Sequence, residues 1–165
     1  MVAGARNVHN LISGNFFGTL HFRLRGHSCR PYNSDTKIRV QLPTQIRFYY
    51  PDASVVCLSN PGDDSYQDQP VVVMEVLSRK TRRIDEGEKK DAYLTIPSLA
   101  VYLLIEQESP VVTVYRRTEQ GFVREVFAEL EATIPLSEIG TELPLAELYE
   151  GVQFSAEPDD DERHN

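Results

Sequence analysis

The chain has 165 residues and a formal net charge of −8, with 41% hydrophobic and 25% charged residues, which suits one globular domain. These proportions exclude a chain that is disordered throughout. The longest fully apolar run, 99–105, is far shorter than the roughly 18 residues needed to cross a bilayer, and residues 1–10 lack the apolar stretch of a secretory signal. We therefore expect a cytoplasmic protein with no membrane partner.

The charge is unevenly distributed along the chain. Residues 1–50 contain 7 basic and 1 acidic side chains, whereas residues 101–150 contain 3 basic and 10 acidic ones. A net acidic protein is not typical of a general nucleic-acid binder. A local basic face is nevertheless enough to hold phosphate groups, so the charge alone does not exclude a nucleic-acid partner.

Two cysteines, Cys29 and Cys57, are the only ones in the chain. They are too few for a disulfide framework or a cysteine-rich zinc site. We interpret both as small buried apolar residues in a reducing compartment.

The first part of the chain predicts one helix followed by four short strands. Apolar residues recur at steps of three and four over 9–26, which predicts an amphipathic helix with Gly26 as its C-cap. Turn-forming residues then separate four strand-like segments, 29–32, 38–42, 45–50 and 53–58. Residues 59–70 have the composition of a loop.

The second part adds helices and strands that pack on the first. A segment that is apolar on both faces, 71–77, indicates a central strand. A helix capped by Ser78 or Thr81 is expected to run to about Leu94. Further elements are expected in this order: a buried strand at 99–105, a hairpin from 111–117 and 121–127, a short helix at 145–149 and a disordered acidic tail at 156–165. This order predicts an α/β or α+β domain with helices flanking a mixed sheet.

Glu75 is the most informative residue because it interrupts the apolar segment 71–77. Burial of an unpaired carboxylate is costly, so a cation, a hydrogen-bond network or a metal must compensate. Asp52 follows Pro51, and if its flanking strands lie beside 71–77, Asp52 meets Glu75 across the ladder. Two such carboxylates suit a hard divalent cation such as Mg²⁺. The alternatives are a structural salt bridge for Glu75 and an ordinary turn for Asp52.

A basic run and a polar helix face follow the central strand. Four cations stand beside the expected helix N-terminus, namely Arg79, Lys80, Arg82 and Arg83. A bound polyanion would offset their unfavourable interaction with the helix dipole. Asp85, Lys89 and Tyr93 are spaced by four and share one helix face. The alternatives are a solvated basic turn and an ordinary ion pair between Asp85 and Lys89.

Several segments taken together resemble a known family. Tyr50-Pro51-Asp52 followed by VMEVLS at 73–78 resembles the signature of the PD-(D/E)xK nucleases. A longer set resembles the Uma-type family of restriction-endonuclease-like proteins: HNLISGN at 9–15, SDTKIRV at 34–40, YYPDASVVC at 49–57, PVVVMEVLS at 70–78, TRRIDEGEKKDAY at 81–93, IPSLAVYLLIEQ at 96–107 and VTVYRR at 112–117. The resemblance implies a single restriction-endonuclease-like domain over 1–155, with an additional C-terminal hairpin and without the family's N-terminal hairpin.

The resemblance also implies a metal-dependent active site. It assigns Asp52 and Glu75 as ligands of Mg²⁺ or Mn²⁺, with the carbonyl of Val76 as a third ligand. Leu77 stands where the signature has its lysine, and the resemblance points instead to Lys89 on the following helix as the catalytic lysine. The accessory residues that it implies are Asp35, Lys90 and Tyr93.

These features predict hydrolysis of phosphodiester bonds in nucleic acid, with DNA as the expected substrate and the four cations at 79–83 on its backbone. A homodimer is a further expectation, because two-fold symmetry suits cleavage of both strands. The alternative is a catalytically inactive module on the same fold that binds nucleic acid or protein, which the acidic net charge and the replaced lysine favour. A truncated, non-functional copy is a third interpretation.

Overall fold

A mixed six-stranded sheet forms the centre of the protein, which we describe from a computed structural model for residues 5–79 and 81–154. In spatial order its strands are β1 (Arg30–Tyr32), β4 (Ala53–Val56), β6 (Pro70–Val76), β7 (Val101–Ile105), β8 (Val112–Thr118) and β9 (Gly121–Phe127). β6 and β7 are parallel, and the other neighbours are antiparallel. The predicted mixed sheet and its C-terminal hairpin, β8–β9, are therefore confirmed.

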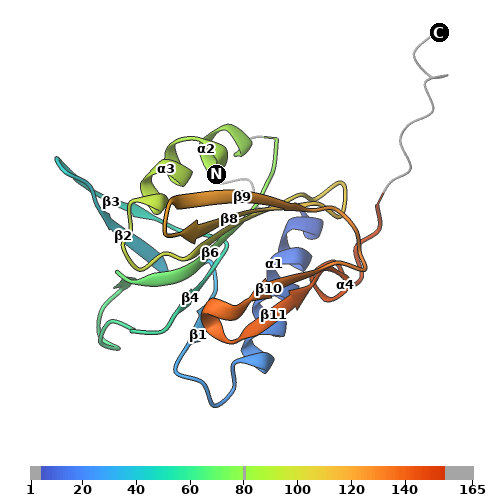
Figure 1. The fold of residues 1–165 in the computed structure, drawn as a ribbon, viewed down its shortest axis with the longest axis horizontal. Coiled ribbons are helices and arrows are strands. Elements are labelled where there is room, and N and C mark those ends of the chain that lie inside the picture. The colour runs from blue at the N-terminus through green and yellow to red at the C-terminus, as the bar shows by residue number, and fades with distance from the viewer. Residues whose placement is uncertain (1–4, 80, 155–165) are drawn as a thin grey trace, which may run out of the picture.

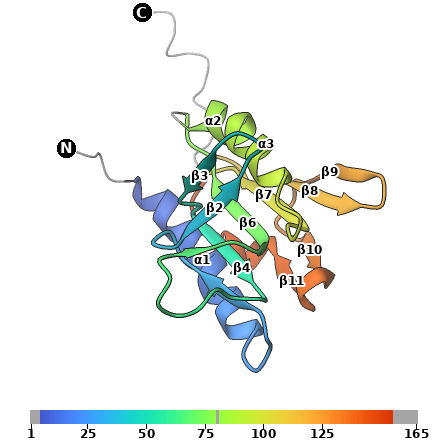
Figure 2. The same ribbon diagram turned by 90° about the vertical axis from the view of Figure 1, so that its left-hand side faces the viewer.

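Two layers cover this sheet, one on each face (Figure 1). On one face lie α1 (Asn7–Arg23), the hairpin of β10 (Thr133–Leu136) and β11 (Thr141–Pro144), joined by the 3₁₀ turn Ser137–Ile139, and α4 (Leu145–Leu148). On the other face lie α2 (Arg82–Glu86), α3 (Glu88–Leu94) and a small sheet of order β3-β2-β5, formed by Ile46–Tyr49, Lys37–Gln41 and Tyr66–Gln67. Figure 2 shows β2 and β3 beside β6 and α3.

β6 lies in the interior because its apolar residues alternate between the two layers. Val72 and Met74 belong to the core that contains α1, whereas Val73 and Leu77 belong to the core that contains α3 and β2. Successive strand residues point to opposite faces, so Glu75 lies on the α3 side between Val73 and Leu77. The strand therefore carries one carboxylate into the more aromatic of the two cores.

The helix expected from 78 to 94 is broken into α2 and α3 at Gly87. Gly87 has φ −113° and ψ −100°, and a Cβ atom there would lie 2.8 Å from the carbonyl oxygen of Arg83. The single continuous helix was therefore a wrong prediction, because the chain turns sharply at a position that only glycine fits. The structure also places β5 inside the predicted loop 59–70 and adds β10–β11, which the sequence analysis did not predict.

Cys29 and Cys57 form a disulfide, so the interpretation of both as separate buried thiols is wrong. Cys29 precedes β1, Cys57 follows β4, and the antiparallel pairing of Arg30 with Val56 brings the two cysteines opposite each other. The bond links residues 28 positions apart. It links the segment between α1 and β1 to the end of β4, at the edge of the sheet where β1 lies.

Two further expectations concern the ends of the chain and the membrane. The acidic tail predicted at 156–165 lies outside the described residues. In the part of the chain that the structure describes, no helix is long and apolar enough to cross a membrane.

Reduction of the Cys29–Cys57 disulfide is expected to lower the free energy of unfolding by about 2–4 kcal/mol, because the bond restricts the unfolded chain. Urea denaturation of the oxidised and the reduced protein measures this difference. A Cys29→Ser/Cys57→Ser double variant is the control, and its unfolding should not respond to reductant. Identical transitions of the wild type in both conditions would contradict the disulfide.

Candidate functional site

A hollow of about 510 Å³ opens at the carboxyl end of β6, and we call it the β6 pocket. The start of α1, the residues before β4, and α2 and α3 all contribute to its lining. Crevices outside the carboxyl ends of parallel strands are common ligand sites in α/β sheets. The titratable side chains that line the pocket are Arg6, His9, Tyr50, Asp52, Glu75, Arg79, Asp85 and Lys89.

Asp52 has one contact to β6 and one to α1. Its Oδ2 accepts a hydrogen bond of 2.7 Å from the backbone N–H of Val76, and His9 Nε2 lies 3.1 Å from the same oxygen. Ala53 pairs with Met74, so Asp52 continues the β4–β6 register toward Glu75. The N–H and C=O of one strand residue leave on the same side, so the Val76 carbonyl faces the side that Asp52 occupies.

His9 was not assigned to the site by the sequence analysis, although it lies within the quoted segment 9–15. Its hydrogen bond to Asp52 raises the pKa of His9 above the ordinary value of 6.5, against the opposing effect of burial. The contact joins α1 to the turn before β4. The spacing of the histidines in the sequence gave no signal for this pairing, because His9 and Asp52 meet only through the fold.

Glu75 is 3% exposed and has one cation nearby. Lys89 Nζ lies 3.7 Å from Glu75 Oε1 and 3.3 Å from Asp85 Oδ1, and the hydroxyl of Tyr93 donates to Glu75 Oε1 at 3.5 Å. Burial raises the pKa of Glu75 well above its ordinary value of 4.5; Lys89 opposes this, and Asp52 and Asp85 add to it. The pocket thus contains more carboxylate charge than its lysine can balance.

Lys89 remains an ammonium group in this setting. Burial lowers its pKa, but Glu75 and Asp85 outweigh burial and raise it above the ordinary 10.5. Burial also raises the pKa of Asp85, whose side chain is almost fully covered. Lys89 therefore bridges two buried acids, one on β6 and one on α2.

Two buried oxygens in the pocket lack a hydrogen-bond partner, namely Asp85 Oδ1 and Gln107 Oε1. Lys89 Nζ lies 3.3 Å from Asp85 Oδ1. The Gln107 side chain is held in place by a different bond, because its Nε2 donates to the carbonyl of Leu77 at 2.8 Å. Unsatisfied buried oxygens are unfavourable unless a cation or water contacts them. Lys89 provides such a contact to Asp85 Oδ1, so Gln107 Oε1 is the oxygen of this pair that is left without one among the described residues.

The donor set suits a small, hard cation that keeps part of its water shell. Across residues 5–79 and 81–154, no group of three or more His, Cys, Asp or Glu side chains is arranged to hold a metal ion. Mg²⁺, however, is commonly held by one or two carboxylates, with waters and substrate phosphates as its other ligands. Asp52, Glu75 and the Val76 carbonyl provide that smaller set of oxygens, on adjoining elements of the same pocket.

The structure does not bring every accessory residue of the sequence analysis to the β6 pocket. Tyr93 is buried against Glu75. Asp35 is an exposed turn residue, and its backbone N–H donates to Asn33 Oδ1. Lys90 turns to the other side of α3, where its Nζ lies 4.9 Å from the ring centre of Tyr115. Asp35 and Lys90 are therefore not among the residues that line the pocket.

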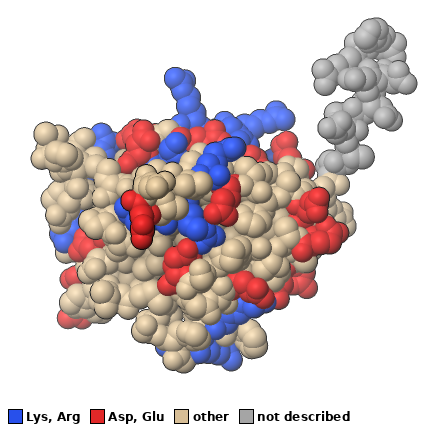
Figure 3. Space-filling view, in the orientation of Figure 1, with Lys and Arg blue, Asp and Glu red and all other residues tan. Residues whose placement is uncertain are grey.

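Of the four cations at 79–83 that were predicted to hold a phosphate backbone, the structure places one in the lining of the pocket. Arg79 lines the pocket with a side chain that is 92% exposed. Arg82 instead pairs with Glu86 and Glu106, while Arg83 is exposed and Lys80 lies outside the described residues. On the face that Figure 3 presents, basic and acidic side chains are intermixed. That face carries no broad basic surface.

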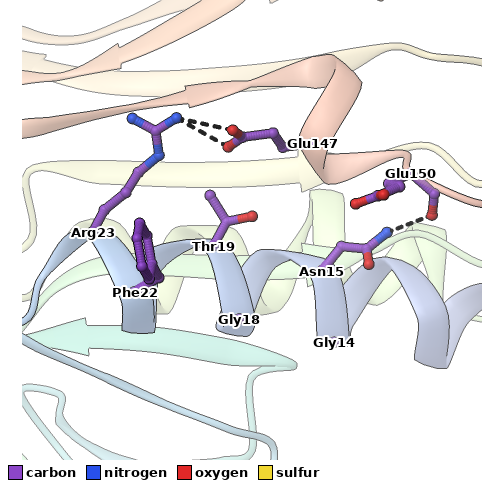
Figure 4. Close-up of a pocket in the computed structure, with 8 residues that line it drawn as sticks. All are labelled: Gly14, Asn15, Gly18, Thr19, Phe22, Arg23, Glu147 and Glu150. Atoms are coloured by element: carbon purple, nitrogen blue, oxygen red, sulfur yellow. Dashed lines mark hydrogen bonds and ion pairs between the residues drawn. The ribbon is translucent and has the colours of Figure 1, made fainter.

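A second hollow, of about 550 Å³, lies between α1 and the α4 region, and Figure 4 shows that Asn15 and Arg23 in its lining already have partners. Asn15 donates to the carbonyl oxygens of Leu148 and Glu150, and Arg23 donates to both carboxylate oxygens of Glu147. These bonds fasten α1 to the C-terminal segment. We assign this hollow a structural role, because Arg23, the cation in its lining, is paired with Glu147.

Comparisons with known proteins agree on one family and one fold. Residues 1–146 match the family described as "Uma2: Putative restriction endonuclease". Two uncharacterized proteins of Synechocystis sp. are similar in sequence. The protein slr1290 is 31% identical over 93% of this chain and 80% of its own length. The protein sll1609 is 30% identical over 64% of this chain and 60% of its own length.

A solved structure has the same fold. It is described as that of "a putative nuclease belonging to DUF820" from Anabaena variabilis, and it superposes with a TM-score of 0.71 at 18% sequence identity. The match covers 92% of this chain and 85% of that one.

The raised pKa of Glu75 predicts a specific dependence of stability on pH. The pKa of Glu75 is higher in the folded state than its ordinary value of 4.5, so the folded protein binds this proton more tightly than the unfolded chain does. The resulting contribution to stability is fully present below pH 4.5 and is lost as the pH rises through the folded-state pKa. Glu75→Gln should therefore gain stability relative to the wild type as the pH rises above 4.5. Urea denaturation across pH 4–8 measures this, and Glu119→Gln in the exposed β8–β9 turn is the control. A constant difference between Glu75→Gln and the wild type would contradict the assignment.

Proposed function

The chain belongs to the Uma2 family, as the sequence resemblance predicted, and from this premise we propose that it is a metal-dependent nuclease that hydrolyses phosphodiester bonds of DNA at the β6 pocket. The observation that carries the proposal is the buried carboxylate of Glu75 beside Lys89. A buried acid with a strongly raised pKa, in a pocket with a specific cationic partner, is typical of functional sites.

In this proposal Asp52, Glu75 and the carbonyl of Val76 hold one Mg²⁺ or Mn²⁺ ion. When bound, such an ion polarises a phosphate oxygen and lowers the pKa of an attacking water. The mutual effect of the acids supports this assignment: Asp52 and Asp85 raise the pKa of Glu75, and a divalent cation would relieve that repulsion.

The chain's own residues position the reacting groups. His9 and the Val76 N–H orient the carboxylate of Asp52, and Tyr93 supports that of Glu75. We assign Lys89 the role of the catalytic lysine, because its ammonium group lies beside Glu75 and lines the pocket. There it would orient a water or stabilise the charge that builds on the phosphate in the transition state.

The domain bounds, the phosphate contacts, the oligomeric state and the location of the protein are further predictions. We propose that 1–155 is one domain, since both cores of the described residues contain strands of the same central sheet. Arg79 is the predicted cation best placed to contact a phosphate at the pocket. A homodimer and a cytoplasmic location stay predictions, and the Cys29–Cys57 disulfide counts against a reducing compartment.

Asp52→Asn is expected to reduce metal-dependent cleavage of plasmid DNA at least about a hundredfold, because several kcal/mol of charge stabilisation would be lost. Calorimetric titration of Mn²⁺ should show weakened binding in the same variant. Asp35→Asn is the matched control, since it changes an exposed turn carboxylate outside the pocket and should leave both readouts unchanged. Cleavage by Asp52→Asn at the wild-type rate would overturn the site. A folded wild type without metal binding or cleavage would instead favour an inactive binding module.

Lys89→Met is expected to slow cleavage by about 10²–10³-fold while Mn²⁺ binding persists, because Lys89 is assigned to the reaction and not to the metal. Lys90→Met removes the neighbouring lysine, whose ammonium group lies over Tyr115, and should retain activity. Single-turnover cleavage rates of the two variants compare them directly. If Lys90→Met lost activity and Lys89→Met kept it, the assignment of the lysine would be reversed.

A further inference from the structure

The outer face of the small sheet carries aromatic and basic side chains, one exposed and the others half-buried, that the proposed chemistry does not use. On β2, Ile38 and Val40 are buried in the core, so Lys37 and Arg39 lie on the opposite, outer face. Lys37 pairs with Tyr66 of β5, and Arg39 pairs with Phe48 of β3. The four outer side chains therefore come together from three strands.

The cations lie against the aromatic rings. Lys37 Nζ is 5.0 Å from the ring centre of Phe48, and Arg39 Cζ is 4.3 Å from that of Tyr66. The two rings meet edge to face at 6.0 Å. Phe48 nevertheless remains 47% exposed, so a large part of its ring is available to a ligand.

The two cations of this surface, Lys37 and Arg39, differ in whether an acidic side chain neutralises them. Both oxygens of Asp68 accept hydrogen bonds from the Arg39 guanidinium, at 2.7 and 2.8 Å, which fixes Arg39 against Tyr66 and neutralises its charge. Lys37 has no acidic partner among the described residues. The surface is thus an aromatic platform on which the Lys37 ammonium group has no acidic partner among residues 5–79 and 81–154.

The platform continues into the β6 pocket. Tyr50 follows Phe48 by two residues, is 56% exposed and lines the pocket. Exposure alternates over 46–50, so Tyr50 shares the outer side of Phe48, at about 6–7 Å along an extended strand. Asp52 follows Tyr50 by another two residues. We call Phe48, Tyr50 and Tyr66, with Lys37, the aromatic track.

We propose that the aromatic track binds a single-stranded segment of DNA, whose unpaired bases stack on the rings while Lys37 contacts its phosphates. This inference rests on the proposed function, because the phosphodiester chemistry of the adjoining pocket identifies the occupant. Exposed aromatic rings interleaved with cations are the usual platform for unpaired bases, and every base has a face that can stack. A duplex keeps its bases stacked inside, so it cannot use these rings in the same way.

The test is fluorescence anisotropy with a short fluorescein-labelled DNA single strand, and with the same strand annealed to its complement, in the presence of a chelator. The wild type is expected to bind the single strand more tightly than the duplex. Phe48→Ala should weaken single-strand binding by about tenfold or more, because a stacking ring is lost, whereas Phe48→Trp should retain it. Val126→Ala on β9, which removes an equally exposed apolar side chain outside the track, should bind as the wild type does.

Three outcomes would overturn the inference. They are wild-type protein that does not bind the single strand, equal binding of single strand and duplex, and unchanged binding by Phe48→Ala. Analytical ultracentrifugation of the wild type and Phe48→Ala tests whether a second copy of this chain occupies the track instead. A wild-type dimer that Phe48→Ala dissociates would show that the track is a dimer interface, and this result would also overturn the inference.

Failure of the inference is distinguishable from failure of the nuclease proposal. Asp52→Asn should keep single-strand binding in chelator while it loses cleavage, so loss of cleavage alone leaves the track in place. Phe48→Ala should still nick plasmid DNA when Mn²⁺ is added, but with reduced preference for single-stranded over duplex substrate. Unchanged preference in Phe48→Ala would contradict the track even if the nuclease activity is established.

Discussion

The placement of one carboxylate inside an apolar strand constrains the whole arrangement. Glu75 lies on the side of β6 that faces α3, where burial disfavours its charge. Lys89 is the cation nearest to it in the described structure, and Asp85 holds Lys89 from α2. The helices α2 and α3 must therefore pack at the carboxyl end of β6, which is where the pocket forms.

The spacing of three residues across the break at Gly87 brings them into one cluster. Asp85, Lys89 and Tyr93 follow one another at intervals of four, so α2 brings Asp85 and α3 brings Lys89 and Tyr93 to the same side. Tyr102 of β7 donates from its hydroxyl to the carbonyl of Asp85 and so ties α2 to the sheet. Arg82 adds an outer connection to Glu106 at the end of β7. The cluster is consequently supported by elements on both sides of the break.

The same end of the sheet receives residues from distant parts of the chain. α1 brings His9 to Asp52, and the antiparallel pairing of β4 with β6 brings Asp52 toward Glu75. The small sheet β3-β2-β5 lies against the α3 side of the core and leads through Tyr50 into the same pocket. The proposed catalytic groups and the proposed aromatic track can thus share one edge, because β3 leads directly into the turn before β4.

The sequence by itself determined the elements that depend on local patterns. The apolar residues of β6 and β7 predicted buried strands, and the turn residues predicted the β8–β9 hairpin. Glu75 stood out because it interrupts an apolar segment, and Asp52 because it follows Pro51 between two strand-like segments. Only the tertiary structure decided the contacts between residues far apart in the chain: the His9–Asp52 pair, the Cys29–Cys57 bond and the separation of Lys89 from Lys90. The physical reason is that strand register and helix packing set these contacts, and both depend on the burial of whole faces against each other rather than on any local run of residues.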